Sequence, residues 1–389
     1  MFLDITLRRN PKLIDTAFKL HQSGLIQPDT YILDLDTIVS NGSLIKDEAD
    51  KYGIKLYFMT KQFGRNPFIA AKLMELGYDG AVAVDYREAE ILYQNGIKLG
   101  HLGHLVQLPS NTIKVMLGRK PEVITVYSIN KAMEISKAAV EMNINQKIML
   151  RIIDTGDTIF PGQQGGFYIK DIIHVVEEIM CLPNIELYGL TSFPCFLVDN
   201  VTGNINETNN LWTIMKAKDI LWDKFGIKIK QINTPSVTCT SIINKIAELG
   251  GTHGEPGHGL LGTTPLHALK DQVEIPAIVY VSEISHNLDD AAYCYGGGYY
   301  RRAHMEAALV GRDMKNIKKI NADAPFDNNI DYYIGLKENA NVGDTAVFAF
   351  RTQIFVTRSE VAVVEGISTD NPHIVGIYDS LGKYLRCGN

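Results

Sequence analysis

The sequence lacks the features that mark secreted, membrane-spanning and nucleic-acid-binding proteins. Its first 20 residues interrupt short apolar runs with charged side chains, so they contain no h-region of a secretory signal peptide. No stretch approaches the roughly 18 consecutive apolar residues of a membrane-spanning helix. The formal net charge is −6 at pH 7, whereas a surface that binds nucleic acid needs clustered Lys and Arg. We therefore expect a cytoplasmic protein with neither nucleic-acid nor membrane partners.

Cysteine is scarce as well. The sequence contains five cysteines, an odd number, and they are widely scattered. No Cys-x-x-Cys motif and no Cys/His pair has the spacing of a metal site. We therefore expect neither disulfide bonds nor a structural metal. The cysteines are Cys181, Cys195, Cys239, Cys294 and Cys387.

The first two thirds of the chain alternate short apolar runs with stretches of helical periodicity. Strands that alternate with helices at this spacing pair in parallel through right-handed crossovers. Roughly eight such units in about 240 residues fit a TIM-type (β/α)8 barrel. The expected strands lie at residues 30–36, 56–61, 80–84, 100–106, 123–126, 147–153, 185–191 and 228–232, and a final loop is expected at 250–262.

Beyond Pro265 the helical periodicity largely disappears. The apolar runs at residues 274–282, 346–350, 353–357 and 361–364 are rich in β-formers and are separated by Gly, Asn and Asp. We therefore predict an α/β protein in which the barrel is followed by a second, mostly β domain. The expected boundaries are an N-terminal extension at 1–29, the barrel at 30–268 and the β domain at 269–389.

Lys61 stands at the end of an early strand. It follows the apolar run Leu56 to Met59 and precedes Gly64 and Pro67, which end the strand before a helical segment. A side chain at the C-terminal end of a barrel strand points into the mouth of the barrel, where catalytic groups lie. We predict that Lys61 is a Schiff-base lysine, although a solvated lysine would fit this segment alone.

Lys61 and the segments after it resemble the fold-type III enzymes that use pyridoxal 5'-phosphate, the alanine racemase and ornithine decarboxylase group. The resemblance covers about residues 30–365 and is most similar to the YhfX-like branch of alanine-racemase-like proteins. Its motifs are Tyr31 to Asp34 with Lys61, Arg151 to Gly156 with Gly165 to Phe167, Gly254 to Gly262, and Tyr293 to Tyr299.

The resemblance implies a role for several residues around pyridoxal phosphate. Lys61 would form the aldimine with it. Glu255 precedes Pro-Gly where decarboxylases carry Glu and racemases Arg, so it would pair with the ring nitrogen, unless it merely caps a turn. The phosphate would be held by backbone N–H groups and hydroxyls. The phosphate candidates are Gly257, His258 and Gly259 with Ser236 and Thr238.

Three further cofactor contacts stay open. Arg65 is either an extra phosphate contact or a surface residue. Arg151 would contact the cofactor's phenolic oxygen or the substrate carboxylate, or form a surface ion pair. Both model families carry a histidine near the ring around the fifth strand, and this chain lacks one there; Phe193 or His104 would take its place.

Racemisation with two bases needs one group on each face of the substrate Cα. Lys61 would serve one face and Tyr295 the other, with Cys294 as a weaker candidate. In this family the tyrosine comes from the partner subunit, so the resemblance also implies a homodimer. Downstream, residues 327–331 and 341–344 look like divergent decarboxylase motifs, with Asp327 in place of the decarboxylases' cysteine.

The leading hypothesis is therefore a pyridoxal-phosphate-dependent amino-acid racemase or epimerase without a metal. A decarboxylase is the alternative, supported by Glu255 and weakened by Asp327. An elimination enzyme like the zinc-dependent D-serine dehydratases lacks support because no His-x-Cys pair follows the barrel. A non-catalytic cofactor carrier would match only the barrel, whereas this chain continues for about 120 residues.

Overall fold

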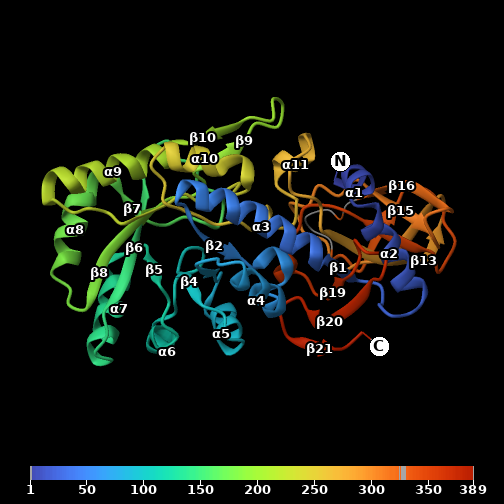
Figure 1. Ribbon diagram of the computed structural model, residues 1–389, viewed down its shortest axis with the longest axis horizontal. Helices are drawn as coiled ribbons and strands as arrows, with labels where there is room; N and C mark the ends of the chain where they lie inside the picture. The colour runs from blue at the N-terminus through green and yellow to red at the C-terminus, as the bar shows by residue number, and fades with distance from the viewer. Residues whose placement is uncertain (1, 324, 326–329, 389) are drawn as a thin grey trace. The chain divides into compact units, whose positions relative to one another are not determined.

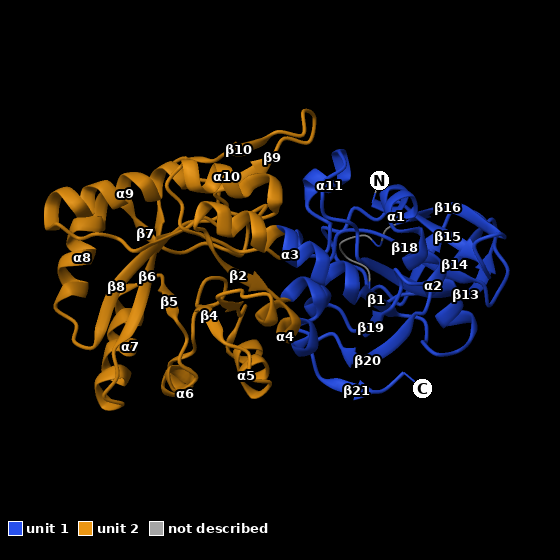
Figure 2. Cartoon of the chain, viewed as in Figure 1, with its two compact units in different colours: residues 1–44, 61–69, 258–389 blue, residues 45–60, 70–257 orange. Residues whose placement is uncertain are grey.

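The chain forms two compact units (Figure 2), which a computed structural model describes over residues 2–323, 325 and 330–388. Unit 1 comprises residues 1–44, 61–69 and 258–389, and unit 2 comprises residues 45–60 and 70–257. Unit 1 is therefore assembled from the beginning, a short middle piece and the end of the chain. Two helices contain a boundary between the units, α3 (Leu35–Tyr52) and α4 (Pro67–Glu75).

Unit 2 is a closed barrel of eight parallel strands with helices around it (Figure 1). Each strand pairs in parallel with the next, and the last pairs with the first. The strands are β2 (Lys55–Met59), β3 (Gly80–Val82), β4 (Leu99–Leu102), β5 (Val123–Val126), β6 (Gln146–Ile153), β8 (Ile185–Thr191), β11 (Gln231–Asn233) and β12 (His253–Gly254). The predicted TIM-type barrel is confirmed.

The remaining elements of unit 2 follow the strands in order. A short strand β7 (Phe167–Tyr168) pairs in parallel with the end of β6, and β9 (Phe196–Val198) and β10 (Ile205–Glu207) form a hairpin. Ser128 accepts a hydrogen bond from the Lys131 backbone and caps the N-terminus of α7 (Ile129–Glu141). The helices are α5 (Tyr86–Gln94), α6 (Ile113–Gly118), α7 (Ile129–Glu141), α8 (Ile172–Met180), α9 (Asn209–Phe225) and α10 (Thr240–Glu248).

Three predicted segments differ from the structure. The strand expected at residues 30–36 exists as β1 (Thr30–Asp34), but it pairs with strands of unit 1 and not with the barrel. The eighth barrel strand is β12, within the segment expected to be a loop, because two residues are too few for a strand pattern. The strand expected at 353–357 is a 3-10 turn, η4 (Ile354–Val356), since a short apolar run does not by itself distinguish the two.

Unit 1 contains a ring of six antiparallel strands. In order around the ring these are β13 (Ile278–Leu288), β14 (Ala291–Tyr295), β17 (Tyr333–Leu336), β16 (Ile317–Asp323), β15 (Ala307–Gly311) and β18 (Thr345–Phe348). From β13 the sheet continues through β1 to β19 (Glu360–Glu365), β20 (His373–Asp379) and β21 (Tyr384–Arg386). The predicted second, mostly β domain is confirmed as part of this unit.

Within residues 2–29, the segment before β1 contributes buried side chains to the core of unit 1. Helices α1 (Phe2–Arg9) and α2 (Pro11–Gln22) pack against its sheet, and a third helix is α11 (Pro265–Leu269). Leu13, Ile14 and Phe18 are fully buried beside apolar residues of β1, β13 and β18. Burial of apolar surface stabilises a fold by about 25 cal/mol per Å². The burial of these three side chains therefore makes α2 an integral part of the unit.

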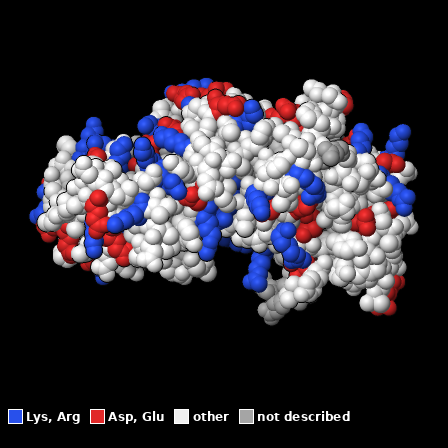
Figure 3. Space-filling model, turned by 90° about the horizontal axis from the view of Figure 1, so that it is seen from below, with Lys and Arg blue, Asp and Glu red and all other residues white. Residues whose placement is uncertain are grey.

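The surface carries charges of both signs. On the face seen in Figure 3, Lys and Arg side chains are interspersed with Asp and Glu. Among the described residues, no helix is both long and apolar enough to cross a membrane.

Folding of the barrel is expected to weaken in mild acid because of His253 on β12. Its side chain is 4% exposed and packs beside Tyr57, and burial, followed by the charge of Lys55, lowers its pKa to about 3. An unfolded histidine has a pKa of about 6.5. This pKa difference therefore leaves the stability intact above pH 6.5 and removes it progressively as the pH falls towards 3. The expected loss between pH 7 and pH 5 is about 2 kcal/mol.

Urea unfolding at pH 7, 6 and 5 measures this loss. In His253→Gln the free energy of unfolding should depend less steeply on pH than in the wild type. The control is His174→Gln, whose side chain is 73% exposed on α8 and which should keep the wild-type slope. An unchanged slope in His253→Gln would show that other groups cause the acid sensitivity.

Candidate functional site

Polar side chains from several strands gather at one end of the barrel in unit 2. His101 lies in β4, Thr125 in β5 and Arg151 in β6, while Asn233 ends β11 and Glu255 directly follows β12. The carboxyl ends of parallel strands meet at the same face of a barrel, and this face carries the active site in enzymes of this fold. We call these residues, with His104 and Phe193, the mouth cluster.

Glu255 is the centre of the mouth cluster. Its Oε1 accepts a hydrogen bond from Asn233 Nδ2 at 2.9 Å and lies 2.7 Å from His101 Nδ1. Its Oε2 is buried, lies 3.8 Å from His104 Nε2 and accepts no hydrogen bond from the described part of the chain. The Glu255 backbone N–H donates to Thr238 Oγ1 at 3.1 Å. One carboxylate oxygen is thus fixed and the other is left with acceptor capacity.

Glu255 is ionised in this setting. Burial opposes its ionisation, but the His104 and His101 imidazoles and the hydrogen bonds from His101 and Asn233 outweigh burial and lower the pKa of Glu255 to about 2. The alternative interpretation, a glutamate that only caps a turn, does not account for its burial among two histidines.

His104 and Phe193, the two residues predicted as alternatives for the place beside a cofactor ring, lie next to each other. Their ring centroids are 6.1 Å apart with the rings edge to face, and the His104 ring is 5.0 Å from that of His101. His101 itself was not predicted as a site residue. Its only signal is a histidine inside an apolar strand, which is more often structural.

Arg151 is buried and not at the surface, so the surface ion pair considered for it is wrong. It is 2% exposed, and its Nη1 donates to Tyr127 Oη at 3.0 Å. The Tyr127 hydroxyl in turn donates to the His104 carbonyl. Arg151 Nε and Nη2 are buried and donate no hydrogen bond to any described residue. Two buried donors on a cation have the chemistry to bind an anionic oxygen.

A glycine allows the close packing around Arg151. Gly166 precedes β7 and has a φ of +123°, and a Cβ placed there would lie 2.8 Å from the Arg151 carbonyl oxygen. A side chain at this position would therefore displace the backbone that carries Arg151.

The two hydroxyls predicted to hold a phosphate already have protein partners. Ser236 Oγ donates to the Phe196 carbonyl at 2.7 Å, and Thr238 Oγ1 accepts from Glu255. The Thr238 hydroxyl can still donate to a ligand, whereas the Ser236 proton is engaged. Their role at a phosphate stays a prediction.

The other predicted site residues belong to unit 1, except Gly257, which is the last residue of unit 2. Lys61 begins the 3-10 turn η1 (Lys61–Phe63), two positions after the end of β2. Arg65 is 3% exposed, has a φ of +54°, and its guanidinium lies 5.1 Å from the centre of the Phe355 ring. The alternative that Arg65 is a surface residue is therefore wrong.

His258 is held as a neutral imidazole. Arg351 Nε donates to His258 Nε2 at 3.1 Å, so Nδ1 carries the proton and donates to Thr263 Oγ1 at 3.1 Å. Burial and the charge of Arg351 lower the pKa of His258 well below its usual value. After it the chain turns tightly, with the Gly262 N–H bonded to the Gly259 carbonyl. Gly257 immediately precedes this turn.

Tyr295 ends β14 and is 38% exposed, with its ring 6.0 Å from that of Tyr333. Its carbonyl accepts from Ser282 Oγ at 2.6 Å, and Asp331 Oδ2 accepts from the Gly297 N–H at 3.1 Å. Cys294 is fully buried, and burial raises the pKa of its thiol to about 12, which makes it unsuitable as a base. Asp327 lies outside the described residues.

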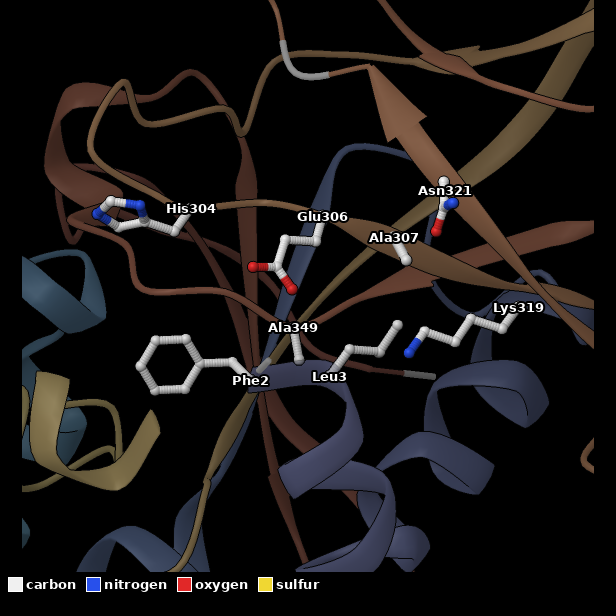
Figure 4. A pocket seen from close by; sticks show the side chains of 8 residues that line it. All are labelled: Phe2, Leu3, His304, Glu306, Ala307, Lys319, Asn321 and Ala349. Atoms are coloured by element: carbon white, nitrogen blue, oxygen red, sulfur yellow. The ribbon is translucent and has the colours of Figure 1, made fainter. Parts of the chain in front are cut away.

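A separate pocket of unit 1 is too small for a cofactor. It has a volume of about 60 Å³, compared with roughly 300 Å³ or more for typical ligand sites. Figure 4 shows Phe2 and Leu3 of α1 facing Glu306, Ala307 and Lys319 around it. Within the described ranges, no group of three His, Cys, Asp or Glu side chains is placed to bind a metal ion.

Comparisons with known proteins agree with this architecture. The alanine racemase N-terminal domain family matches residues 33–265, and the YhfX-like C-terminal domain family matches residues 279–374. The chain is 45% identical over 386 residues to the uncharacterized protein YhfX of Escherichia coli K12, which covers 99% of this chain and 100% of that protein.

Solved structures share the fold at low identity. D-threonine aldolase from Filomicrobium marinum is 13% identical with a TM-score of 0.68, covering 92% of this chain and 96% of that one. Alanine racemase from Clostridium difficile 630 in complex with cycloserine is 18% identical with a TM-score of 0.63, covering 90% and 98%. Diaminopimelate decarboxylase from M. jannaschii in complex with L-lysine is 13% identical with a TM-score of 0.66, covering 95% and 92%.

Proposed function

The chain belongs to the alanine racemase N-terminal domain family, of fold-type III, and we propose that it is a pyridoxal-phosphate-dependent enzyme that racemises or epimerises an amino acid at Cα. The observation that carries the assignment of the cofactor is the buried, ionised Glu255 with one oxygen that accepts no hydrogen bond from the described residues. A protonated pyridine nitrogen is the kind of donor that such a carboxylate oxygen accepts.

The residues of the chain fit the cofactor's chemical groups. Glu255 would hold the ring nitrogen, and the two buried donors of Arg151 would suit its phenolic oxygen or a substrate carboxylate. Lys61 would attach the cofactor covalently. When bound, pyridoxal phosphate withdraws electrons from the substrate Cα and makes its proton more acidic. The other proposed contacts are His104 and Phe193 at the ring, and Arg65, Ser236, Thr238, Gly257, His258 and Gly259 at the phosphate.

Two groups would move the proton at Cα. The Lys61 amine would take or return it on one face, and the Tyr295 hydroxyl would do so on the other. Tyr295 is partly exposed in this chain, which suits a tyrosine that serves the site of a second copy. We therefore propose a homodimer as the active form, with an amino acid as its small-molecule substrate.

Decarboxylation is the second candidate. A carboxylate beside the ring nitrogen, here Glu255, favours the protonated ring and so a strong electron sink, as decarboxylases use. The bond from Cα to the carboxylate would then break in place of the Cα–H bond, carbon dioxide would leave, and a proton would be added to Cα to give the amine.

Incubation of the cofactor-loaded protein with L- and D-amino acids in heavy water tests both reactions. We expect deuterium at Cα and the appearance of the opposite enantiomer. Release of carbon dioxide and an amine would favour decarboxylation. Neither outcome with any amino acid, together with no cofactor bound, would contradict the proposed function.

Tyr295→Phe should slow exchange of one enantiomer selectively. Removal of one of two bases is expected to cost about 100-fold or more in its Cα exchange rate, because general acid–base catalysis typically contributes this much. Exchange of the other enantiomer, which depends on Lys61, should change less. The matched control is Tyr333→Phe, since Tyr333 is 45% exposed and neighbours Tyr295. Equal losses for both enantiomers would contradict the role of Tyr295.

A further inference from the structure

A chain of two hydrogen bonds runs from β5 to Glu255 inside the barrel. Thr125 Oγ1 lies 2.5 Å from His101 Nε2, and His101 Nδ1 lies 2.7 Å from Glu255 Oε1. His101 is completely buried, and so is Thr125. Because β4 and β5 are paired neighbours, with His101 opposite Val123, the backbone itself places the hydroxyl next to the imidazole.

This arrangement determines which oxygen of Glu255 accepts hydrogen bonds from the protein. Both nitrogens of His101 have partners, so the imidazole ring is fixed at both ends. Asn233 Nδ2 also donates to the same oxygen, Oε1, at 2.9 Å. All hydrogen bonds that the described residues make to the carboxylate therefore converge on one oxygen, and the carboxylate plane is set without engaging Oε2.

If His101 had only a structural role, it would not need a buried carboxylate, that of Glu255, as its partner. Burying a carboxylate is costly unless it is hydrogen-bonded, and an apolar side chain at the Glu255 position would avoid that cost. The chain instead keeps an ionised group in the barrel with three polar residues arranged to hold it. The arrangement is comparable to the outer partners that orient metal ligands and tune their basicity.

We propose, on the basis of the proposed function, that His101 is a positioning residue that, held by Thr125, keeps the Glu255 carboxylate ionised and presents its Oε2 to the ring nitrogen of pyridoxal phosphate. His101 does not touch the cofactor in this role. It acts through Glu255, and Thr125 acts through His101.

Four variants separate this role from a structural one. Glu255→Gln is the reference for loss of the carboxylate. His101→Leu removes both hydrogen bonds, and His101→Gln retains a donor of similar reach. Thr125→Val removes only the hydroxyl at nearly constant volume, so it keeps the inference testable if His101→Leu does not fold.

The first measurement uses the protein without cofactor. Isotope-edited infrared spectra of glutamate-labelled protein, with Glu255→Gln to assign the signal, report the ionisation of Glu255 as a function of pH. In His101→Leu the protonated-to-ionised ratio at a given pH should rise at least about tenfold, which corresponds to one pKa unit. Thr125→Val should raise this ratio by a smaller factor. In His101→Gln the ratio should stay close to its wild-type value.

The second measurement uses pyridoxal phosphate labelled with ¹⁵N at the ring nitrogen. Its NMR shift reports ring protonation, and the protonated-to-neutral ratio should fall at least about tenfold in His101→Leu. Unchanged Glu255 ionisation in both His101→Leu and Thr125→Val, or unchanged ring protonation where Glu255→Gln lowers it, would overturn the role of His101. If Glu255→Gln itself leaves ring protonation unchanged, the proposed function fails while the infrared titration still decides the hydrogen-bonded chain.

Discussion

Replacement of Lys61 by alanine is expected to abolish covalent attachment of pyridoxal phosphate and to lower turnover at least ~10³-fold. The amine would be lost both as the point of attachment and as one of the two groups that move the Cα proton, and the loss of either typically costs orders of magnitude. The absorbance band of the bound cofactor should disappear from Lys61→Ala, and borohydride reduction of the wild type followed by peptide mass spectrometry should locate the cofactor on Lys61.

A lysine on the strand that precedes Lys61 provides the control. Lys55 begins β2, six positions before Lys61, and is exposed, so Lys55→Ala should keep the absorbance band and the turnover. Added methylamine should restore part of the activity of Lys61→Ala by replacing the missing amine. Recovery of the reduced cofactor on another lysine would disprove the assignment of Lys61.

Replacement of Glu255 by glutamine should lower turnover about 10²- to 10³-fold while leaving some cofactor bound. An amide cannot stabilise a charged ring nitrogen as a carboxylate does, so the substrate Cα would lose acidity. Steady-state kinetics should show the loss mainly in kcat, because the proposed contacts at the phosphate and at Lys61 would remain. Glu248→Gln, at the exposed end of α10, is the matched control for the same chemical change.

The pKa of Glu255 also sets the pH range in which its carboxylate stabilises the folded protein. Its folded pKa of about 2 is below the value of about 4.3 in an unfolded chain. The carboxylate therefore stabilises the folded protein above about pH 4.3, and this contribution is lost as the pH falls towards 2. Glu255→Gln should remove that part of the acid dependence. If turnover in Glu255→Gln equals that of the wild type, the ring nitrogen has another partner.

The sequence predicted what depends on neighbouring residues along the chain. The rhythm of strands and helices identified the barrel, because each strand pairs with the next one in sequence, and Glu255 was found through the Pro-Gly that follows it. His101 was missed because its partner Glu255 lies 154 positions away. Strand β1 was assigned to the barrel for the same reason, since its partners, β13 and β19, lie in the last third of the chain.

The local sequence pattern also does not predict that Arg65 and Arg151 are buried. Arginine is mostly exposed, so composition favours the surface for any single arginine. What decides the outcome here is an aromatic ring beside each guanidinium, Phe355 for Arg65 and Tyr127 for Arg151. Those rings are supplied by distant strands and turns, which a single sequence does not bring together.

The division of unit 1 among three pieces of the chain sets an order of events during synthesis on the ribosome. All eight barrel strands have been made once residue 254 is complete. Strand β1, however, must wait for β19, because Thr30 pairs with Glu360, 330 residues later. Until then the nascent chain exposes the apolar residues of α2 and β1, which makes it a natural client of chaperones that bind unfolded apolar segments. Synthesis of β19, and not completion of the barrel, is then the step that ends this exposure.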